Sequence, residues 1–163
     1  MRIWIGGLVL CCIAAGAVAQ PDDVKITRKT VHSFYKSLNL LTPTPIVDAG
    51  DMATDKRRGG RKQPALKKIY GNDLAKQAFG QKAIPFPIGS VLINEKTESG
   101  RVTAIGIMVK RSARYDSAHG DWEYFFADNA GEFSNGRLAE CIACHTQVKS
   151  EDYIFYPAAQ PKP

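Results

Sequence analysis

Several stretches in the second half of the chain alternate between hydrophobic and polar residues or are rich in β-forming residues. These are the patterns of β-strands with one buried face. They cover residues 65–70, 89–96, 102–110 and 122–126. Glu98-Ser99-Gly100 is a short turn sequence between the second and third stretches. Since so short a connection leaves neighbouring strands antiparallel, we expect residues 89–110 to form a β-hairpin.

The helices that the chain predicts are short. Residues 21–41 carry apolar side chains at helical spacing, and a Thr-Pro-Thr-Pro run at 42–45 ends that segment. The apolar face of this helix consists of Val31, Phe34, Tyr35 and Leu38. Asn72 is a suitable N-cap for a second helix over residues 73–79. Residues 137–145 predict a third helix, and we expect residues 129–136 before it to form a loop.

The N-terminus has the features of a secretory signal. Arg2 precedes an almost wholly apolar run over residues 3–18, and Ala17-Val18-Ala19 has the small-x-small pattern of a signal-peptidase site. The alternative is an uncleaved membrane anchor, for which the apolar run is short. We therefore expect residues 1–19 to be a cleaved signal peptide and residues 20–163 to form a single domain that is exported to the periplasm.

Removal of the signal peptide changes the cysteine count. Cys11 and Cys12 leave with it, so only Cys141 and Cys144 remain in the mature chain. A single pair two residues apart is not the disulfide framework of a small exported domain. After the signal, no apolar segment is long enough to span a bilayer.

The overall composition is that of an ordinary globular protein. Hydrophobic residues make up 44% of the chain and the formal net charge is +6. This balance suggests an acidic partner or an anionic surface and does not by itself indicate nucleic acid. Residues 56–62 form a basic cluster without interleaved aromatic residues. A solvated loop explains this cluster more simply than a docking patch.

Cys141-Ile142-Ala143-Cys144-His145 is a C-x-x-C-H motif, typical of c-type haem attachment. The two thiols can add to the two vinyl groups at one edge of the porphyrin, and the adjacent histidine can bind the iron. A thioredoxin-like redox pair would need βαβ surroundings, and a zinc site would need further ligands, for which only His32 and His119 remain. The motif predicts one covalent haem c, with His145 as proximal ligand.

A bound haem would replace part of the protein core, so its walls should be apolar. We expect Trp122, Tyr124 and Phe126 in the aromatic strand to line its pocket, although ordinary core packing explains the same residues. Met108 could face the iron as a sixth ligand or line the pocket. His119 precedes the aromatic strand, and a local structural role fits it better than iron binding.

Several different short motifs follow one another in a characteristic order between residues 69 and 155. They are Tyr70-Gly71-Asn72-Asp73-Leu74-Ala75, Phe86-Pro87-Ile88-Gly89-Ser90-Val91-Leu92, Met108-Val109-Lys110-Arg111, Tyr115-Asp116, Gly120-Asp121-Trp122-Glu123-Tyr124-Phe125, Cys141-Ile142-Ala143-Cys144-His145 and Asp152-Tyr153-Ile154-Phe155. In order and spacing these motifs resemble the cytochrome P-460 family, whose relatives include the beta-sheet cytochromes c-prime. The resemblance implies an α+β fold, mainly an antiparallel β-sheet packed on a covalently bound haem c, with a few short helices. It also implies an iron with an open distal side.

The resemblance is incomplete at two positions that matter for chemistry. The family's enzymes carry a haem-linked lysine in the first hairpin strand, where this chain has Asn94. They carry a distal carboxylate in the second strand, where this chain has Gly106. Lys96 should share the strand face of Asn94 but lie further along it. Both departures argue against hydroxylamine oxidation, so we name no catalytic residue.

The sequence therefore predicts a periplasmic mono-haem c-type cytochrome with an open distal site. Its expected partner is a small gaseous or nitrogen-oxide ligand such as nitric oxide. The first alternative is a single-electron carrier with a redox partner protein, and the second is a hydroxylamine-oxidising haem enzyme. We expect no nucleic acid partner and no membrane contact after signal cleavage. A homodimer formed through the sheets is compatible with the resemblance.

Overall fold

The predicted hairpin is the centre of the fold. In the computed structural model, which describes residues 24–43, 45–47 and 65–157, it consists of β4 (Val91–Glu98) and β5 (Arg101–Lys110). Ser99 and Gly100 connect the strands with φ of 47° and 77°. Positive φ at both central residues is what a tight hairpin turn requires to match the twist of its strands. The hairpin prediction is confirmed.

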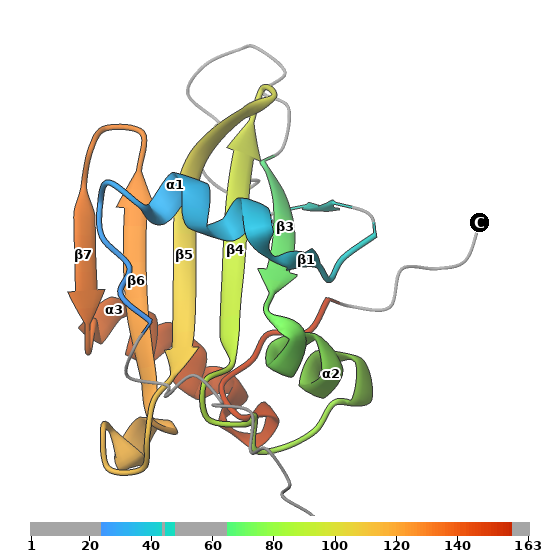
Figure 1. Cartoon of the computed structure of the whole chain (residues 1–163), viewed down its shortest axis with the longest axis vertical. Coiled ribbons are helices and arrows are strands. Elements are labelled where there is room, and N and C mark those ends of the chain that lie inside the picture. The colour runs from blue at the N-terminus through green and yellow to red at the C-terminus, as the bar shows by residue number, and fades with distance from the viewer. Residues whose placement is uncertain (1–23, 44, 48–64, 158–163) are drawn as a thin grey trace, which may run out of the picture.

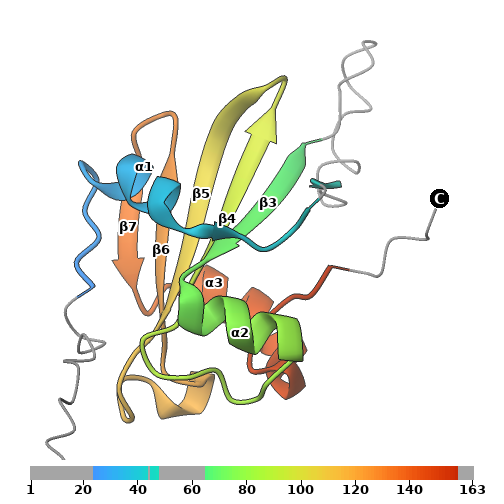
Figure 2. The same cartoon turned by 45° about the vertical axis from the view of Figure 1, so that its right-hand side comes forward.

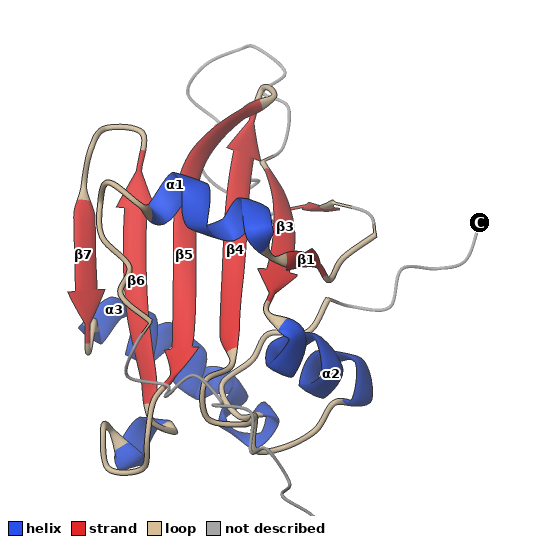
Figure 3. Cartoon of the chain, in the orientation of Figure 1, coloured by secondary structure: helices blue, strands red, loops and turns tan. Residues whose placement is uncertain are grey.

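The other strands extend this hairpin on both sides into a seven-stranded antiparallel sheet within the described residues (Figures 1 and 3). The strand order is β1-β3-β4-β5-β6-β7, and β2 also pairs with β3. The added strands are β1 (Asn39–Leu40), β2 (Ile46–Val47), β3 (Leu66–Gly71), β6 (Trp122–Asp128) and β7 (Phe133–Gly136). The predicted α+β class with a mainly antiparallel sheet is confirmed.

The loop predicted for residues 129–136 is wrong at its end. Phe133–Gly136 forms β7 and pairs antiparallel with β6, with Tyr124 opposite Gly136 and Phe126 opposite Ser134. This strand is short and polar at its centre, so it shows no alternation in the sequence. Its pairing with the long strand β6 supplies the backbone hydrogen bonds that the local pattern does not predict.

The helices are short, as expected. They are α1 (Val31–Phe34), α2 (Asp73–Gln81) and α3 (Ala139–His145), with 3-10 turns η2 (Tyr35–Ser37), η4 (Ser117–His119) and η5 (Thr146–Glu151). Asn72 caps α2 as predicted, since its side-chain oxygen accepts from the Ala75 N–H at 3.0 Å. The same side chain also bonds Gly89 and Val91, which ties the start of α2 to β4.

The two faces of the sheet bury different sets of residues because successive side chains on a strand point to opposite faces. On one face, Ile93, Ile107 and Phe125 pack against the N-terminal segment that contains Val31. On the opposite face, Leu92 and Met108 belong to a second cluster. Figures 1 and 2 show α1 crossing the first face, whereas α3 lies on the far side of the strands.

None of the helices in the described residues combines the length and apolar character needed to cross a membrane. The predicted signal peptide, Cys11, Cys12 and the basic cluster at 56–62 all lie outside the described residues.

Candidate functional site

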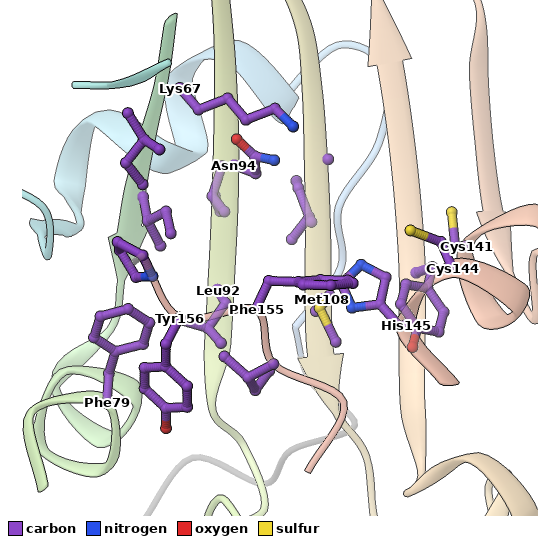
Figure 4. Close-up of a pocket in the computed structure, with 18 of the residues that line it drawn as sticks. Lys67, Phe79, Leu92, Asn94, Met108, Cys141, Cys144, His145, Phe155 and Tyr156 are labelled. Atoms are coloured by element: carbon purple, nitrogen blue, oxygen red, sulfur yellow. The ribbon is translucent and has the colours of Figure 1, made fainter. Parts of the chain in front are cut away.

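A cavity of about 550 Å³ lies on the second face of the sheet (Figure 4). Strands β3 to β6 form its floor, and α3 and the segment after η5 complete its walls. Its apolar lining includes Leu92, Met108, Tyr124, Phe126, Ile154 and Phe155. A largely apolar cavity of roughly 300–1,000 Å³ is the usual size of a site for a small molecule or cofactor.

All three side chains of the C-x-x-C-H motif line this cavity. Cys141, Cys144 and His145 belong to α3, where residues three or four positions apart share a face. The helix therefore turns the two thiols and the imidazole toward the same space, and Figure 4 shows them together at one end of the pocket. Neither cysteine forms a disulfide. Burial raises the pKa of the Cys141 thiol, and the nearby Glu140 adds to this effect.

His145 is held by a hydrogen bond from its ring to the backbone. Its Nδ1 lies 2.6 Å from the carbonyl oxygen of Tyr153. A carbonyl oxygen can only accept, so Nδ1 carries the proton and Nε2 keeps its lone pair. Burial lowers the pKa of His145, and the hydrogen bond to Tyr153 opposes this only in part. The neutral imidazole that results is the form that binds a metal ion.

Two aromatic rings fix the plane of the imidazole. The centroid of the Tyr124 ring lies 5.3 Å from that of His145, and the Phe155 ring lies 5.2 Å away in an edge-to-face arrangement. Tyr124 comes from β6 and Phe155 from the segment after η5, so the ring is supported by the sheet and by the chain that follows the motif.

The end of the pocket away from the thiols carries two polar side chains, Asn94 and Lys67, among apolar ones. Ile69, Asn94, Gly106 and Phe126 form one row across β3, β4, β5 and β6. A Cβ at Gly106 would meet no atom within 4 Å, so this part of the floor is open. Lys67 also lines the pocket, and Figure 4 shows its side chain running toward Asn94.

Lys67 carries no functional signal in the sequence. It lies in the short strand predicted at residues 65–70, two positions before Ile69, and alternation alone would have placed both on one face. Which face of β3 points into the pocket depends on the register of β3 against β4, in which Lys67 lies opposite Lys96. No local signal in the sequence sets that pairing.

The structure places the residues predicted to line the haem pocket in two different settings. Met108, Tyr124 and Phe126 line the cavity. Trp122 is not among its lining residues and is wholly buried beside it. Its indole N–H donates to the Asp152 carbonyl at 2.9 Å, and its ring packs edge-on against Phe86. The alternation of the strand puts Trp122 on the pocket face, but it lies beyond Tyr124, where the neighbouring segments close over the sheet.

The remaining candidate residues have local partners. His119 Nδ1 lies 3.0 Å from the Asp116 carboxylate, in the turn before β6. Lys96 pairs with Glu98 at 3.2 Å. Across the described ranges, no group of three or more His, Cys, Asp and Glu side chains is arranged to hold a metal ion, so the zinc alternative gains no support there.

Two phenol groups suit a pocket that holds a bound molecule. The hydroxyls of Tyr124 and Tyr156 are buried and have no hydrogen-bond partner within the described part of the chain. Both residues line the cavity, and burial raises the pKa of both phenols. A buried hydroxyl without a partner costs about 1–3 kcal/mol. A cofactor with polar edge groups would reduce this cost, and the apolar walls would suit its ring, so these residues fit a haem.

The family model described as Cytochrome P460 matches residues 49–156. This range includes the whole C-x-x-C-H motif and strands β3 to β7. No curated protein matches the chain.

Proposed function

Because the chain belongs to the cytochrome P460 family, a family of haem-binding cytochromes, we propose that it carries one haem c attached through Cys141 and Cys144. The observation that supports this most directly is that both thiols and His145 line one apolar cavity. The hydrogen bond from Nδ1 to Tyr153 leaves Nε2 of His145 for the iron. When bound, haem supplies an iron that takes up small ligands and exchanges single electrons.

The polar end of the pocket would face the propionate edge of the haem. The propionates lie on the opposite edge of the porphyrin from the vinyl groups to which the thiols add. Lys67 lies away from Cys141 and Cys144 in Figure 4. Its ammonium can donate a charge-assisted hydrogen bond to a carboxylate.

We further propose that the site binds a small nitrogen-oxide ligand such as nitric oxide. Gly106 leaves open space on the sheet side of the pocket, and Leu92 and Phe126 give this region apolar walls. Neither Gly106 nor the Asn94 amide can accept a proton from a substrate at neutral pH. These side chains favour reversible ligand binding over oxidation of hydroxylamine.

A single-electron carrier is the second candidate, because of Met108. This residue is 8% exposed and lines the same cavity, in a row with Leu92 and Tyr124 across the sheet. A thioether that reached the iron would fill the open position and raise the reduction potential. Binding of an external ligand would then require that bond to break.

Absorption spectroscopy of the holoprotein, with and without nitric oxide, tests the two candidates. A high-spin ferrous spectrum that shifts on addition of nitric oxide supports ligand binding. A low-spin ferrous spectrum that becomes high-spin in Met108→Leu would contradict the open site and support the electron carrier. Acid-acetone extraction of the same sample tests covalent attachment, because a non-covalent haem would move into the acetone phase.

Export to the periplasm is part of the proposal, because attachment of c-type haem takes place outside the cytoplasm. Cell fractionation combined with intact mass measurement checks it. We expect a periplasmic chain that starts at Gln20 and carries the added mass of one haem. A haem-loaded chain found in the cytoplasm would contradict this part of the proposal.

A further inference from the structure

A buried ion pair includes Asp152, the residue before Tyr153, whose carbonyl bonds the motif histidine. Lys110 Nζ lies 2.7 and 2.8 Å from the two carboxylate oxygens of Asp152. The side chains are only 8% and 7% exposed. Lys110 ends β5 and Asp152 follows η5, so the pair joins the sheet to the segment after the motif. The ammonium also lies 4.8 Å from the centre of the Trp122 ring.

Asp152 is fixed by further contacts. Its carboxylate accepts from the Phe86 N–H at 2.8 Å, and its backbone carbonyl accepts from the Trp122 indole at 2.9 Å. The carboxylate and the backbone carbonyl of Asp152 are therefore held by segments far away in the sequence, whereas its N–H bonds Lys149 in the preceding turn. Removal of one partner of such a buried pair leaves a charge without compensation, so the pair strongly constrains the local backbone.

The backbone that this pair holds is an unusual one. Asp152 and Tyr153 have φ of 52° and 66°, in the left-handed region that non-glycine residues seldom adopt. Two such residues in succession cost of order 1–3 kcal/mol each, unless the surroundings impose them. This conformation directs the Tyr153 carbonyl to His145 Nδ1 at 2.6 Å. The Asp152 N–H bonds Lys149 and the Tyr153 N–H bonds Val148, which closes the end of η5 locally. These local bonds and the tertiary anchors at Asp152 together hold the hydrogen bond to the histidine.

We propose that Asp152 and Lys110 are positioning residues that tune His145 as an iron ligand. They hold the Tyr153 carbonyl against Nδ1, which keeps the imidazole in one tautomer and one orientation. A strong acceptor at Nδ1 makes Nε2 more basic and so favours the ferric state. This inference rests on the proposed haem site, and it gives the ion pair a role in setting the reduction potential.

A purely structural role is the competing explanation, and the chain contains a matched control for it. Arg111 and Glu123 form a second buried pair, in which Arg111 Nε donates to the carboxylate at 2.6 Å. Their side chains are 10% and 12% exposed, similar to those of the first pair. Arg111 directly follows Lys110 but also donates to the Val24 carbonyl, near the first face of the sheet. Loss of this pair should cost stability without touching His145.

The experiment compares Asp152→Asn, Lys110→Met and Glu123→Gln in the haem-loaded protein. We measure the iron–histidine stretching frequency by resonance Raman, the midpoint potential and the unfolding temperature. Substitution of a residue that hydrogen-bonds a metal-bound histidine usually changes metal affinity or activity by about tenfold or more. We therefore expect Asp152→Asn to shift the ferric–ferrous equilibrium about tenfold toward ferrous, which is about 59 mV for one electron. Its iron–histidine frequency should fall.

The control variants decide the outcome. Glu123→Gln should unfold at a lower temperature with unchanged frequency and potential, and Lys110→Arg should recover most of what Lys110→Met loses. The proposal is overturned if Asp152→Asn leaves frequency and potential unchanged, or if Glu123→Gln shifts them equally. If Asp152→Asn does not fold, Lys110→Met and Lys110→Arg provide the same comparison.

A second readout separates this inference from the haem proposal. The nuclear magnetic resonance signal of the His145 Nδ1 proton reports its hydrogen bond in any folded sample, whether or not it carries haem. We expect that signal to show a weaker bond in Lys110→Met and no change in Glu123→Gln. If extraction shows that no haem is attached, the haem proposal fails, but this comparison still tests whether the ion pair positions the histidine.

Discussion

Asn94 lies directly opposite Gly106 in the β4–β5 ladder, and both residues line the pocket that holds the motif cysteines. Side chains directly opposite each other across two strands share a face. The two positions where the chain departs from the pattern of the P-460 enzymes therefore form one neighbouring pair on the pocket floor.

We expect no lysine–haem cross-link in this protein. The amide of Asn94 cannot form that bond, and Lys96 lies about 6 to 7 Å further along the strand, where it pairs with Glu98. Tryptic mass spectrometry should find the haem only on the peptide that contains Cys141 and Cys144. Haem found on a peptide with Lys96 or Lys67 would contradict the prediction. Asn94→Lys should move the protein toward the cross-linked type, with Lys96→Met as the unchanged control.

Removal of either motif thiol should weaken the retention of haem. Cys141→Ala and Cys144→Ala each remove one of the two thioethers, so the haem should be held by one bond through denaturation. Acid-acetone extraction and intact mass measure this directly, and the double variant should release its haem completely. Haem that stayed with the chain in the double variant would mean that another residue anchors it.

His145→Ala should leave the haem tethered while the coordination of the iron changes. The thioethers do not depend on the imidazole, but the iron loses its proximal ligand. The ferric absorption spectrum should therefore change, and added imidazole should restore much of the original spectrum. An unchanged spectrum in this variant would show that a different residue binds the iron.

Gly71 and Gly106, two glycines of the sheet, should respond differently to a methyl group. A Cβ at Gly106 meets no atom within 4 Å, so Gly106→Ala should be neutral or stabilise by up to about 1 kcal/mol. A Cβ at Gly71 would lie 2.9 Å from Leu41 Cδ1 and 3.2 Å from the Val91 carbonyl oxygen. Gly71→Ala should cost about 1–3 kcal/mol. Urea unfolding of both variants checks this, and equal losses would mean that the floor at Gly106 is closed.

Lys67→Met should lower the midpoint potential of the bound haem. A positive charge near the haem edge favours the ferrous state, since that state carries one positive charge fewer, and removal of the ammonium takes this effect away. Lys96 is a matched control, because it lies opposite Lys67 across the ladder but does not line the pocket. Lys96→Met should leave the potential nearly unchanged. Equal shifts in both variants would contradict a specific role for Lys67.

Local sequence was enough for the parts of the fold that depend on neighbours in the chain. Alternation over residues 89–110 and the Ser99-Gly100 turn identified the hairpin, because strand period and turn geometry are both local properties. Asn72 marked the start of α2 for the same reason, since a cap bonds an amide three residues away. The C-x-x-C-H spacing needed only a helix to bring its three side chains to one face.

Long-range pairing decided the rest of the site. Lys67 reaches the pocket only through the register of β3 on β4, and β7 exists only because β6 offers it a partner. The Tyr153 carbonyl meets His145 just after Asp152, where Lys110 and Trp122, both more than 25 residues away, add tertiary anchors to the local cap of η5. No pattern of neighbouring residues encodes such contacts, because their free energy is gained only when segments distant in the chain have already packed together.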